Sequence, residues 1–338
     1  GTLFYRPLPG EEMAKAEVVA PVAEKFVVVN ELVCEGCGDC GDVSSCMSVE
    51  PVDTEFGRKT RIHQSSCNQD YSCLKGDCPS FLTVYSEAGL RKPEPSAIDI
   101  PAMPEPALPE VDGRYRIYMV GIGGTGVVTV NQVLAYAAML DGFDVESLDQ
   151  SGMAQKGGAV LSSLVLSRPG GEDASNKVGL GQADVVLAFD AVGSASAPNL
   201  DRMSPERTVV VADKAVRPTS DTVRHVDRKL PRAELLAQTV GEYSRAIDYA
   251  QVEGEPLIER VLRNHVLTNS FVLGAAYQAG RIPVSRESIE QAFRLNGISI
   301  EANLLAFRLG RLVQHNPKAI PVETDSIASS ARAEPVRY

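Results

Sequence analysis

The chain has 338 residues, of which 44% are hydrophobic and 23% are charged, proportions that are ordinary for a globular protein with two domains. Its formal net charge of -11 argues against nucleic acid and against an anionic membrane surface as partners. No apolar run is long enough to cross a bilayer and no signal-peptide pattern is present, so we expect a cytoplasmic protein. Because the chain begins with Gly1, we expect it to be either processed or one segment of a longer polypeptide.

Composition changes sharply along the chain. All seven cysteines lie between Cys34 and Cys78, shortly after an expected strand at 26–29, whereas six prolines lie between residues 86 and 113. We therefore expect an N-terminal extension (1–25), a cysteine-bearing domain (26–85), a semi-extended Pro-rich linker (86–113), an α/β domain (114–316) and a loosely ordered tail (317–338).

The region 114–316 alternates between short apolar runs and helical stretches. Strands are expected at 117–120, 143–146, 160–166, 184–190 and 208–212. Helices are expected from the glycine-rich turn to about residue 140, and over 232–280 and 285–313. Strands separated by helices indicate a Rossmann-like α/β fold with a largely parallel sheet.

The cysteines form two runs. The first reads Cys34-x2-Cys37-x2-Cys40-x5-Cys46, and the second reads Cys67-x5-Cys73-x4-Cys78-Pro79. Three cysteines at x2 spacing can present three thiolates to three irons of a cubane. In two-cluster ferredoxins the last cysteine of each run ligates the other cluster, and proline follows the final one. We therefore predict two 4Fe-4S clusters in a small ferredoxin-like α+β domain.

The second run is one cysteine short, and Asp70 occupies the middle position. A carboxylate can bind iron, so Asp70 would complete a set of eight ligands. The crossed assignment places Cys34, Cys37, Cys40 and Cys78 on one cluster, and Cys46, Cys67, Asp70 and Cys73 on the other. If Asp70 is an ordinary solvated acid, the second site holds a 3Fe-4S cluster or none. Zinc is the competing metal, but zinc ribbons use two Cys-x2-Cys pairs instead of three cysteines in file.

A glycine-rich segment follows the strand at 117–120 and begins a helix. It matches G-x-G-x-x-G, and its candidate cofactor-binding residues are Gly121, Gly123, Gly124, Thr125 and Gly126. Glu146 and Asp149 lie about where a ribose-binding acid would follow. From the residues alone a nicotinamide or flavin nucleotide is the default ligand, and close packing of strand and helix is the alternative.

A second glycine-rich loop joins two strands over residues 149–160. Its candidate ligand-contacting residues are Gln155, Lys156, Gly157 and Gly158. The four histidines form no cluster in the sequence, so none is assigned a catalytic role; they are His63, His225, His265 and His315.

Five stretches carry a resemblance to a known family. They are VCEGCGDCG (33–41), TEFGRKTRIHQSSCNQDYSCLKGDCPSF (54–81), GIGGTGVVT (121–129), GMAQKGGAV (152–160) and LNGISIEANLLAFRLGR (295–311). With them the chain resembles the indolepyruvate:ferredoxin oxidoreductases, which belong to the thiamine-dependent 2-oxoacid:ferredoxin oxidoreductases. It is similar to the ferredoxin-type and gamma-type portions of that enzyme.

The resemblance implies oxidative decarboxylation of an arylpyruvate by thiamine diphosphate with Mg, at or near an interface with a partner. Electrons would pass through the 4Fe-4S clusters to an external ferredoxin, and coenzyme A would take the acyl group. The gamma-type domain would then pack over the thiamine site instead of binding a dinucleotide. This chain has no Gly-Asp-Gly run followed by Asn-Asn, so the thiamine-binding catalytic part is expected in another chain or segment.

The leading hypothesis is therefore an electron-relay and site-completing subunit of an indolepyruvate:ferredoxin oxidoreductase, assembled in a higher oligomer. One alternative is a ferredoxin–nucleotide oxidoreductase that binds NAD(P) at Gly121–Gly126. Another is an electron-carrier docking module.

Overall fold

The computed structural model describes residues 25–85, 100–152, 158–170, 175–225, 228–245 and 250–319. Several expectations lie outside these ranges: the extension before residue 25, the linker over 86–99, the loop residues Gln155, Lys156 and Gly157, and the tail beyond 319. Within the described ranges, no helix combines the length and apolar character needed to cross a membrane.

The cysteine-bearing part consists of two antiparallel strand pairs and two short helices. Its elements are β1 (Lys25–Val29), α1 (Asp39–Ser44), β2 (Val49–Thr54), β3 (Gly57–Ile62), the 3-10 helix η1 (Ser72–Gly76) and β4 (Phe81–Tyr85). Strand β1 pairs with β4, and β2 pairs with β3. The core of this part contains few large side chains, because buried cysteines take their place beside Val27, Val29 and Ile62.

The larger part is built on one six-stranded sheet. Its strands are β5 (Arg114–Ile122), β6 (Asp144–Ser151), β7 (Ala159–Ser167), β8 (Val185–Ala188), β9 (Val209–Asp213) and β10 (Ala250–Val252), in the order β10-β9-β8-β5-β7-β6. The pairs β10–β9, β9–β8 and β8–β5 are parallel, which confirms the expected parallel majority. Strands β5–β7 and β7–β6 pair antiparallel, so β7 separates β6 from β5.

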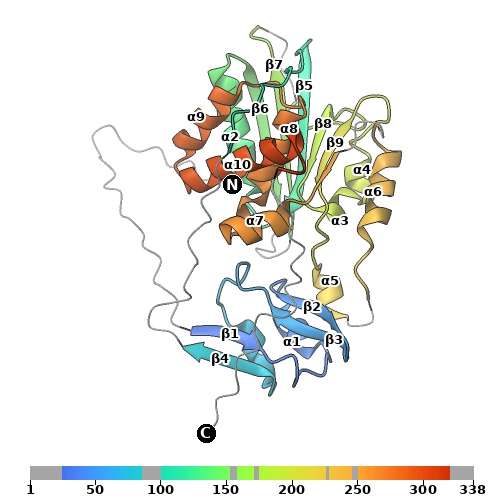
Figure 1. The fold of residues 1–338 in the computed structure, drawn as a ribbon. Helices are drawn as coiled ribbons and strands as arrows, with labels where there is room; N and C mark the ends of the chain where they lie inside the picture. The colour runs from blue at the N-terminus through green and yellow to red at the C-terminus, as the bar shows by residue number, and fades with distance from the viewer. Residues whose placement is uncertain are drawn as a thin grey trace, which may run out of the picture.

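The central strands are buried on both faces, because each carries an unbroken apolar run. Ile117 and Met119 of β5 enter one core, and Tyr118 and Val120, which point to the opposite face, enter another. Helices cover both faces: α2 (Val127–Leu140), α7 (Gly254–Leu262), α8 (Thr268–Gln278), α9 (Arg286–Asn296) and α10 (Ile300–His315) on one, and α3 (Ala191–Ser194), α4 (Ala197–Leu200) and α6 (Ala233–Glu242) on the other (Figure 1).

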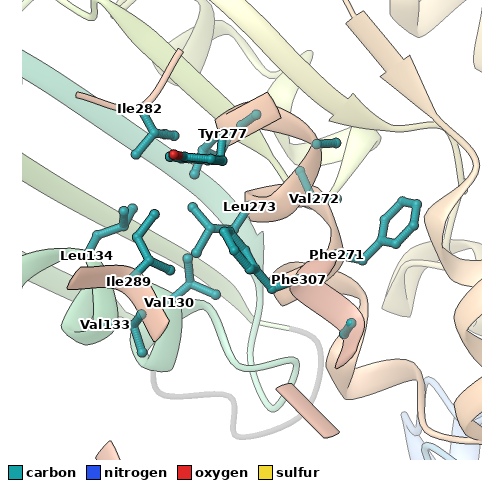
Figure 2. Packing of buried hydrophobic residues seen from close by; sticks show 14 of the residues in the cluster. Val130, Val133, Leu134, Phe271, Val272, Leu273, Tyr277, Ile282, Ile289 and Phe307 are labelled. Atoms are coloured by element: carbon teal, nitrogen blue, oxygen red, sulfur yellow. The ribbon is translucent and has the colours of Figure 1, made fainter. Parts of the chain in front are cut away.

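The larger core lies where four helices converge. Figure 2 shows side chains of this core from α2, α8, α9 and α10, among them Val130, Leu273, Ile289 and Phe307. Helices α8 and α10 pack unusually closely: a Cβ on Gly274 would lie 1.9 Å from the Phe307 carbonyl oxygen. A Cβ on Gly310 would lie equally close, at 1.9 Å, to the Phe271 carbonyl oxygen. The two glycines therefore let the helix backbones touch.

Two expectations for the helical regions are wrong. The region 232–280 contains β10, which lies beside β9 at the sheet edge. A strand of three residues is too short to show a period of two in the sequence. The region 285–313 contains two helices, because Gly297 takes a left-handed conformation with φ 77° and ends α9.

The two parts of the molecule meet through α5 (Ser220–Arg224), which reaches down to the cysteine-bearing part (Figure 1). Val223 is 4% exposed and belongs to the core that contains the cysteines. The Arg58 guanidinium donates to the Thr222 carbonyl oxygen at 2.6 Å, and Arg224 pairs with Asp42 at 3.2 Å. The smaller part therefore completes its core with a side chain from the larger one.

The described end of the Pro-rich region lies against α8 and α10. Tyr277 donates its hydroxyl to Glu105 at 2.7 Å, and Arg311 binds the other oxygen of Glu105 at 3.1 Å. Gln278 donates to the Pro104 carbonyl oxygen at 2.9 Å. Residues 100–112 contain no helix or strand, yet these contacts attach Pro104 and Glu105 to the α/β part.

Candidate functional site

A cavity of about 410 Å³ lies between the two parts of the molecule. One wall comes from the cysteine-bearing part and includes Met47, Ser48, Glu50, His63, Ser65, Ser66, Cys67 and Asn68. The other comes from the α/β part and includes Ile122, Gly123, Gly124, Thr125, Arg217, Pro218, Glu255, His265 and Val266. The glycine loop and the second cysteine run, far apart in the sequence, therefore share one cavity.

The first cysteine group lies around the loop before α1. Burial raises the pKa of the Cys40 thiol, and the neighbouring Cys34 and Cys37 thiols raise it further. The Gly36 amide donates to Cys34 Sγ at 3.4 Å. Gly36 has φ 71°, and a Cβ there would lie 2.0 Å from the Arg58 carbonyl oxygen, so only glycine fits this turn. The loop thus gathers three thiols and directs a backbone amide at one of them.

The second group draws on both cysteine runs. Burial raises the pKa of the Cys73 thiol to about 11, and the charges of Cys67, Cys46 and Asp70 add to the rise. Cys46, the last cysteine of the first run, therefore lies near Cys67 and Cys73. None of the seven cysteines forms a disulfide. Buried thiols that repel one another when ionised fit an iron cluster, because its positive irons supply the opposite charge.

Two predicted ligands have partners of another kind. Asp70 is exposed, and its Oδ1 accepts hydrogen bonds from the Ser72 amide at 3.1 Å and from the Ser72 hydroxyl at 2.8 Å. These hydrogen bonds hold the carboxylate against the first residue of η1. Cys78 Sγ lies 3.1 Å from the Ser80 hydroxyl.

The glycine loop turns tightly from β5 into α2. Gly124 and Gly126 have φ of 86° and 89°, and a Cβ on Gly121 would lie 2.4 Å from a Val127 methyl. The Gly123 amide donates to the Gly158 carbonyl oxygen at 2.8 Å. The loop is therefore built for close packing, and one of its amides is already used by the neighbouring loop.

The acids proposed for a ribose are also poorly placed. Both lie on β6, and β7 separates that strand from the glycine loop of β5. Asp149 Oδ1 accepts hydrogen bonds from the Asn131 amide at 2.8 Å and from the Ser162 hydroxyl at 2.5 Å. A dinucleotide fold places this acid on the strand beside the glycine loop. The geometry therefore argues against the NAD(P)-binding alternative.

Sequence reasoning missed a buried charge network behind the cavity. Burial opposes ionisation of Arg217, but the charges of Glu255 and Asp213 outweigh it and hold the Arg217 pKa above its usual value. Burial raises the pKa of Asp213 to about 6 despite the nearby Arg217 charge. Burial also raises the pKa of Asp190. No sequence motif links these residues, because the sheet edge and α7 bring them together.

Two of the four histidines, for which no cluster was expected, lie close together in the structure. His63 follows β3, whereas His265 lies in the 3-10 helix η3 (His265–Leu267), and their ring centroids are 5.7 Å apart. Glu259 of α7 lies between them, 3.7 Å from His63 Nε2 and 3.9 Å from His265 Nδ1. The sequence gives no sign of this group, because its members meet only across the boundary between the two parts.

The family of the chain follows from comparison of its sequence with known proteins. The family described as pyruvate ferredoxin/flavodoxin oxidoreductase matches residues 116–313, more than half of the chain, and the chain belongs to that family. Indolepyruvate oxidoreductase subunit IorB of Methanothermobacter thermautotrophicus is 32% identical over 201 residues, which cover 58% of this chain and 96% of that protein. The subunit of the same name from Thermococcus kodakarensis is 28% identical over 211 residues, covering 58% and 94%. These relatives confirm the resemblance to the indolepyruvate:ferredoxin oxidoreductases and the expectation of an oxidoreductase subunit.

Solved structures were compared as well. The gamma subunit of a keto/oxoacid ferredoxin oxidoreductase from Geobacter sulfurreducens matches with a TM-score of 0.41 and 22% identity, covering 59% of this chain and 98% of that one. A 2-oxoglutarate:ferredoxin oxidoreductase from Magnetococcus marinus matches with a TM-score of 0.41 and 18% identity, covering 60% and 31%.

Proposed function

We propose that this chain is the electron-relay and site-completing subunit of a thiamine-diphosphate-dependent arylpyruvate:ferredoxin oxidoreductase, with indolepyruvate as its substrate. The observation that carries the proposal is the cavity, which Cys67 and the glycine loop of the family domain both line. Electron transfer falls off steeply with distance, so a reaction centre and its first electron acceptor must be close. The names of the relatives support the choice of substrate.

The proposed reaction balances as follows. A 2-oxoacid, coenzyme A and two oxidised ferredoxins give carbon dioxide, an acyl-CoA, a proton and two reduced ferredoxins. Thiamine diphosphate with Mg, held at or near the interface with a catalytic partner, supplies the decarboxylation chemistry. The partner and the external ferredoxin make the active enzyme a larger assembly.

In this proposal the cysteines hold two 4Fe-4S clusters with the crossed ligand sets: Cys34, Cys37, Cys40 and Cys78, and Cys46, Cys67, Asp70 and Cys73. The proximity of Cys46 to Cys67 and Cys73 supports the crossing. Gly123, Gly124 and Thr125 line the cavity from the side of the α/β part. The Gln155–Gly158 loop would contact the partner or its cofactor.

Anaerobic purification of the untagged complex, followed by mass spectrometry and cofactor analysis, tests the proposal. We expect a co-purifying subunit that carries thiamine diphosphate, and indolepyruvate-dependent reduction of ferredoxin. We also expect about eight iron and eight labile sulfide per chain. A partner without thiamine diphosphate would overturn the function, whereas about four iron or fewer would overturn the two-cluster assignment.

A further inference from the structure

A compact group of potential metal ligands lies at the cavity wall, separate from the cysteines. The nitrogen and oxygen atoms that His63, Glu259 and His265 offer all lie within 4.8 Å of one another. His63 and His265 both line the cavity. None of the three belongs to the predicted cluster ligand sets.

Hydrogen bonds around His63 direct its free nitrogen toward Glu259. His63 Nδ1 lies 2.9 Å from the Ser66 hydroxyl, which in turn donates to the Ser48 hydroxyl at 2.9 Å. Ser66 can therefore accept a hydrogen bond from Nδ1–H of His63, which leaves the lone pair on Nε2, the nitrogen that faces the carboxylate. Glu259 Oε1 also accepts a hydrogen bond from Ser65. Partners of this kind orient the ligands of protein metal sites.

His265 supplies a second, independent observation. Its side chain is 9% exposed, and its Nδ1 is buried without a hydrogen-bond partner. Leaving a buried polar atom unpaired costs free energy, and that cost calls for an explanation. An imidazole nitrogen is a common ligand of transition-metal ions. The two imidazoles and the carboxylate face one another, and a cation bound between them would stabilise this arrangement.

We propose that His63 Nε2, Glu259 Oε1 and His265 Nδ1 bind one divalent transition-metal ion of the Zn²⁺ type. Bonds of about 2.0–2.2 Å at tetrahedral angles separate such donors by about 3.4 Å. The observed separations of 3.7 Å and 3.9 Å from Glu259 Oε1 are close to this value, and the ligand atoms of the two histidines lie within 4.8 Å of each other. The adjoining cavity leaves room for water in the fourth position, as in open zinc sites.

The surrounding charges permit a cation here. Arg217 lines the same cavity as His265, but it is paired with Glu255 at 3.2 Å and with Asp213 at 3.9 Å. Its charge is thus balanced within its own network, and Glu259 remains to neutralise part of the metal charge. Because His63 and the other two ligands come from different parts of the molecule, the ion would also join those parts.

Zinc loading of the full-length, cluster-containing protein tests the site. The protein is equilibrated anaerobically with one equivalent of Zn²⁺ and desalted, and its zinc content is measured by mass spectrometry. We expect about one zinc per chain and, in zinc K-edge X-ray absorption, a first shell of nitrogen and oxygen without sulfur. A sulfur shell would mean that zinc has entered a cysteine site and would overturn the proposal.

Variants distinguish zinc binding at this site from incidental zinc binding elsewhere on the protein. His265→Ala and Glu259→Gln should each weaken zinc binding at least about tenfold. His225→Ala is the control, because His225 is a half-exposed histidine that also faces a carboxylate, at 3.8 Å from Asp221. Cluster absorbance checks that each variant is folded. If His265→Ala does not fold, the zinc content of Glu259→Gln, which keeps the side-chain volume, tests the site. The proposal would be overturned if wild type binds no zinc, or if His265→Ala and Glu259→Gln still bind it as wild type does.

Discussion

Burial governs the ionisation of the side chains behind the cavity. Asp213 is 1% exposed, yet it faces Arg217 at 3.9 Å without a hydrogen bond between the two. The loss of hydration outweighs that attraction, which is why the Asp213 pKa rises instead of falling. A buried ion pair of this kind is weak evidence for stability.

The raised pKa gives a pH dependence with a definite sign. Because the folded protein holds a proton on Asp213 up to about pH 6, folding takes up a proton between the unfolded pKa and that value. The stability contributed by Asp213 is therefore greatest at acidic pH and falls as the pH rises through this window. Between about pH 5.5 and pH 8, wild type should lose about 1 kcal/mol of unfolding free energy relative to Asp213→Asn. Anaerobic urea denaturation followed by circular dichroism measures the difference, and a pH-independent difference would contradict it.

Asp70 is the other residue whose chemistry can be tested directly. A carboxylate binds iron less tightly than a thiolate, so the iron at Asp70 should be lost first under mild oxidation. Wild type treated with ferricyanide should show the paramagnetic resonance signal of a 3Fe-4S cluster, whereas Asp70→Cys should resist the loss. Asp53→Cys, which adds an exposed thiol outside the two cysteine runs, is the control. Equal iron loss from wild type and Asp70→Cys would mean that Asp70 does not ligate iron and only binds Ser72.

At the scale of elements, the glycines between α8 and α10 allow the two helices to pack closely in the larger core. Gly274→Ala should destabilise the protein by about 2–3 kcal/mol, because the added methyl collides with the Phe307 backbone and forces the helices apart. Gly241→Ala on α6 is a matched control, since a Cβ there meets nothing within 4 Å. That control should be neutral or more stable by up to about 1 kcal/mol. Thermal unfolding of both variants checks the prediction, which fails if they unfold alike.

The elements that sequence reasoning predicted are those with a local signal. The runs of β5, β8 and β9 are apolar without interruption, and the glycine loop marks the beginning of α2. Sheet order was harder, because no local signal shows that β7, and not β6, lies beside β5. The short β10 was missed because three residues show no period of two, and its place is fixed by β9.

At the scale of the whole molecule, the strand order decides what the glycine loop can bind. Because β7 separates β5 from β6, neither Glu146 nor Asp149 lies on the strand beside the loop, and Asp149 is also engaged by Asn131 and Ser162. We therefore expect no tight NADH binding. Calorimetric titration of the full-length protein should show no saturable heat, and a micromolar dissociation constant would contradict the prediction.

One part of the candidate site could be predicted from the sequence, and the other part could not. The cysteines are close in sequence, so their spacing alone indicated clusters. The Arg217 network, the His63–Glu259–His265 group and the cavity itself are assembled from segments far apart in the chain. A single sequence carries no signal for contacts between segments so far apart.

The insertion of Val223 into the cysteine-bearing core has a consequence for the order of synthesis. Val223 packs against Gly41, where an added Cβ would lie 2.4 Å from the Val223 carbonyl oxygen. The ribosome makes the cysteines before it makes α5, so the cysteine-bearing part lacks this side of its core until the later segment arrives. The clusters that we propose would therefore gain full shelter only after α5 has emerged. Their insertion would then depend on folding of the α/β part.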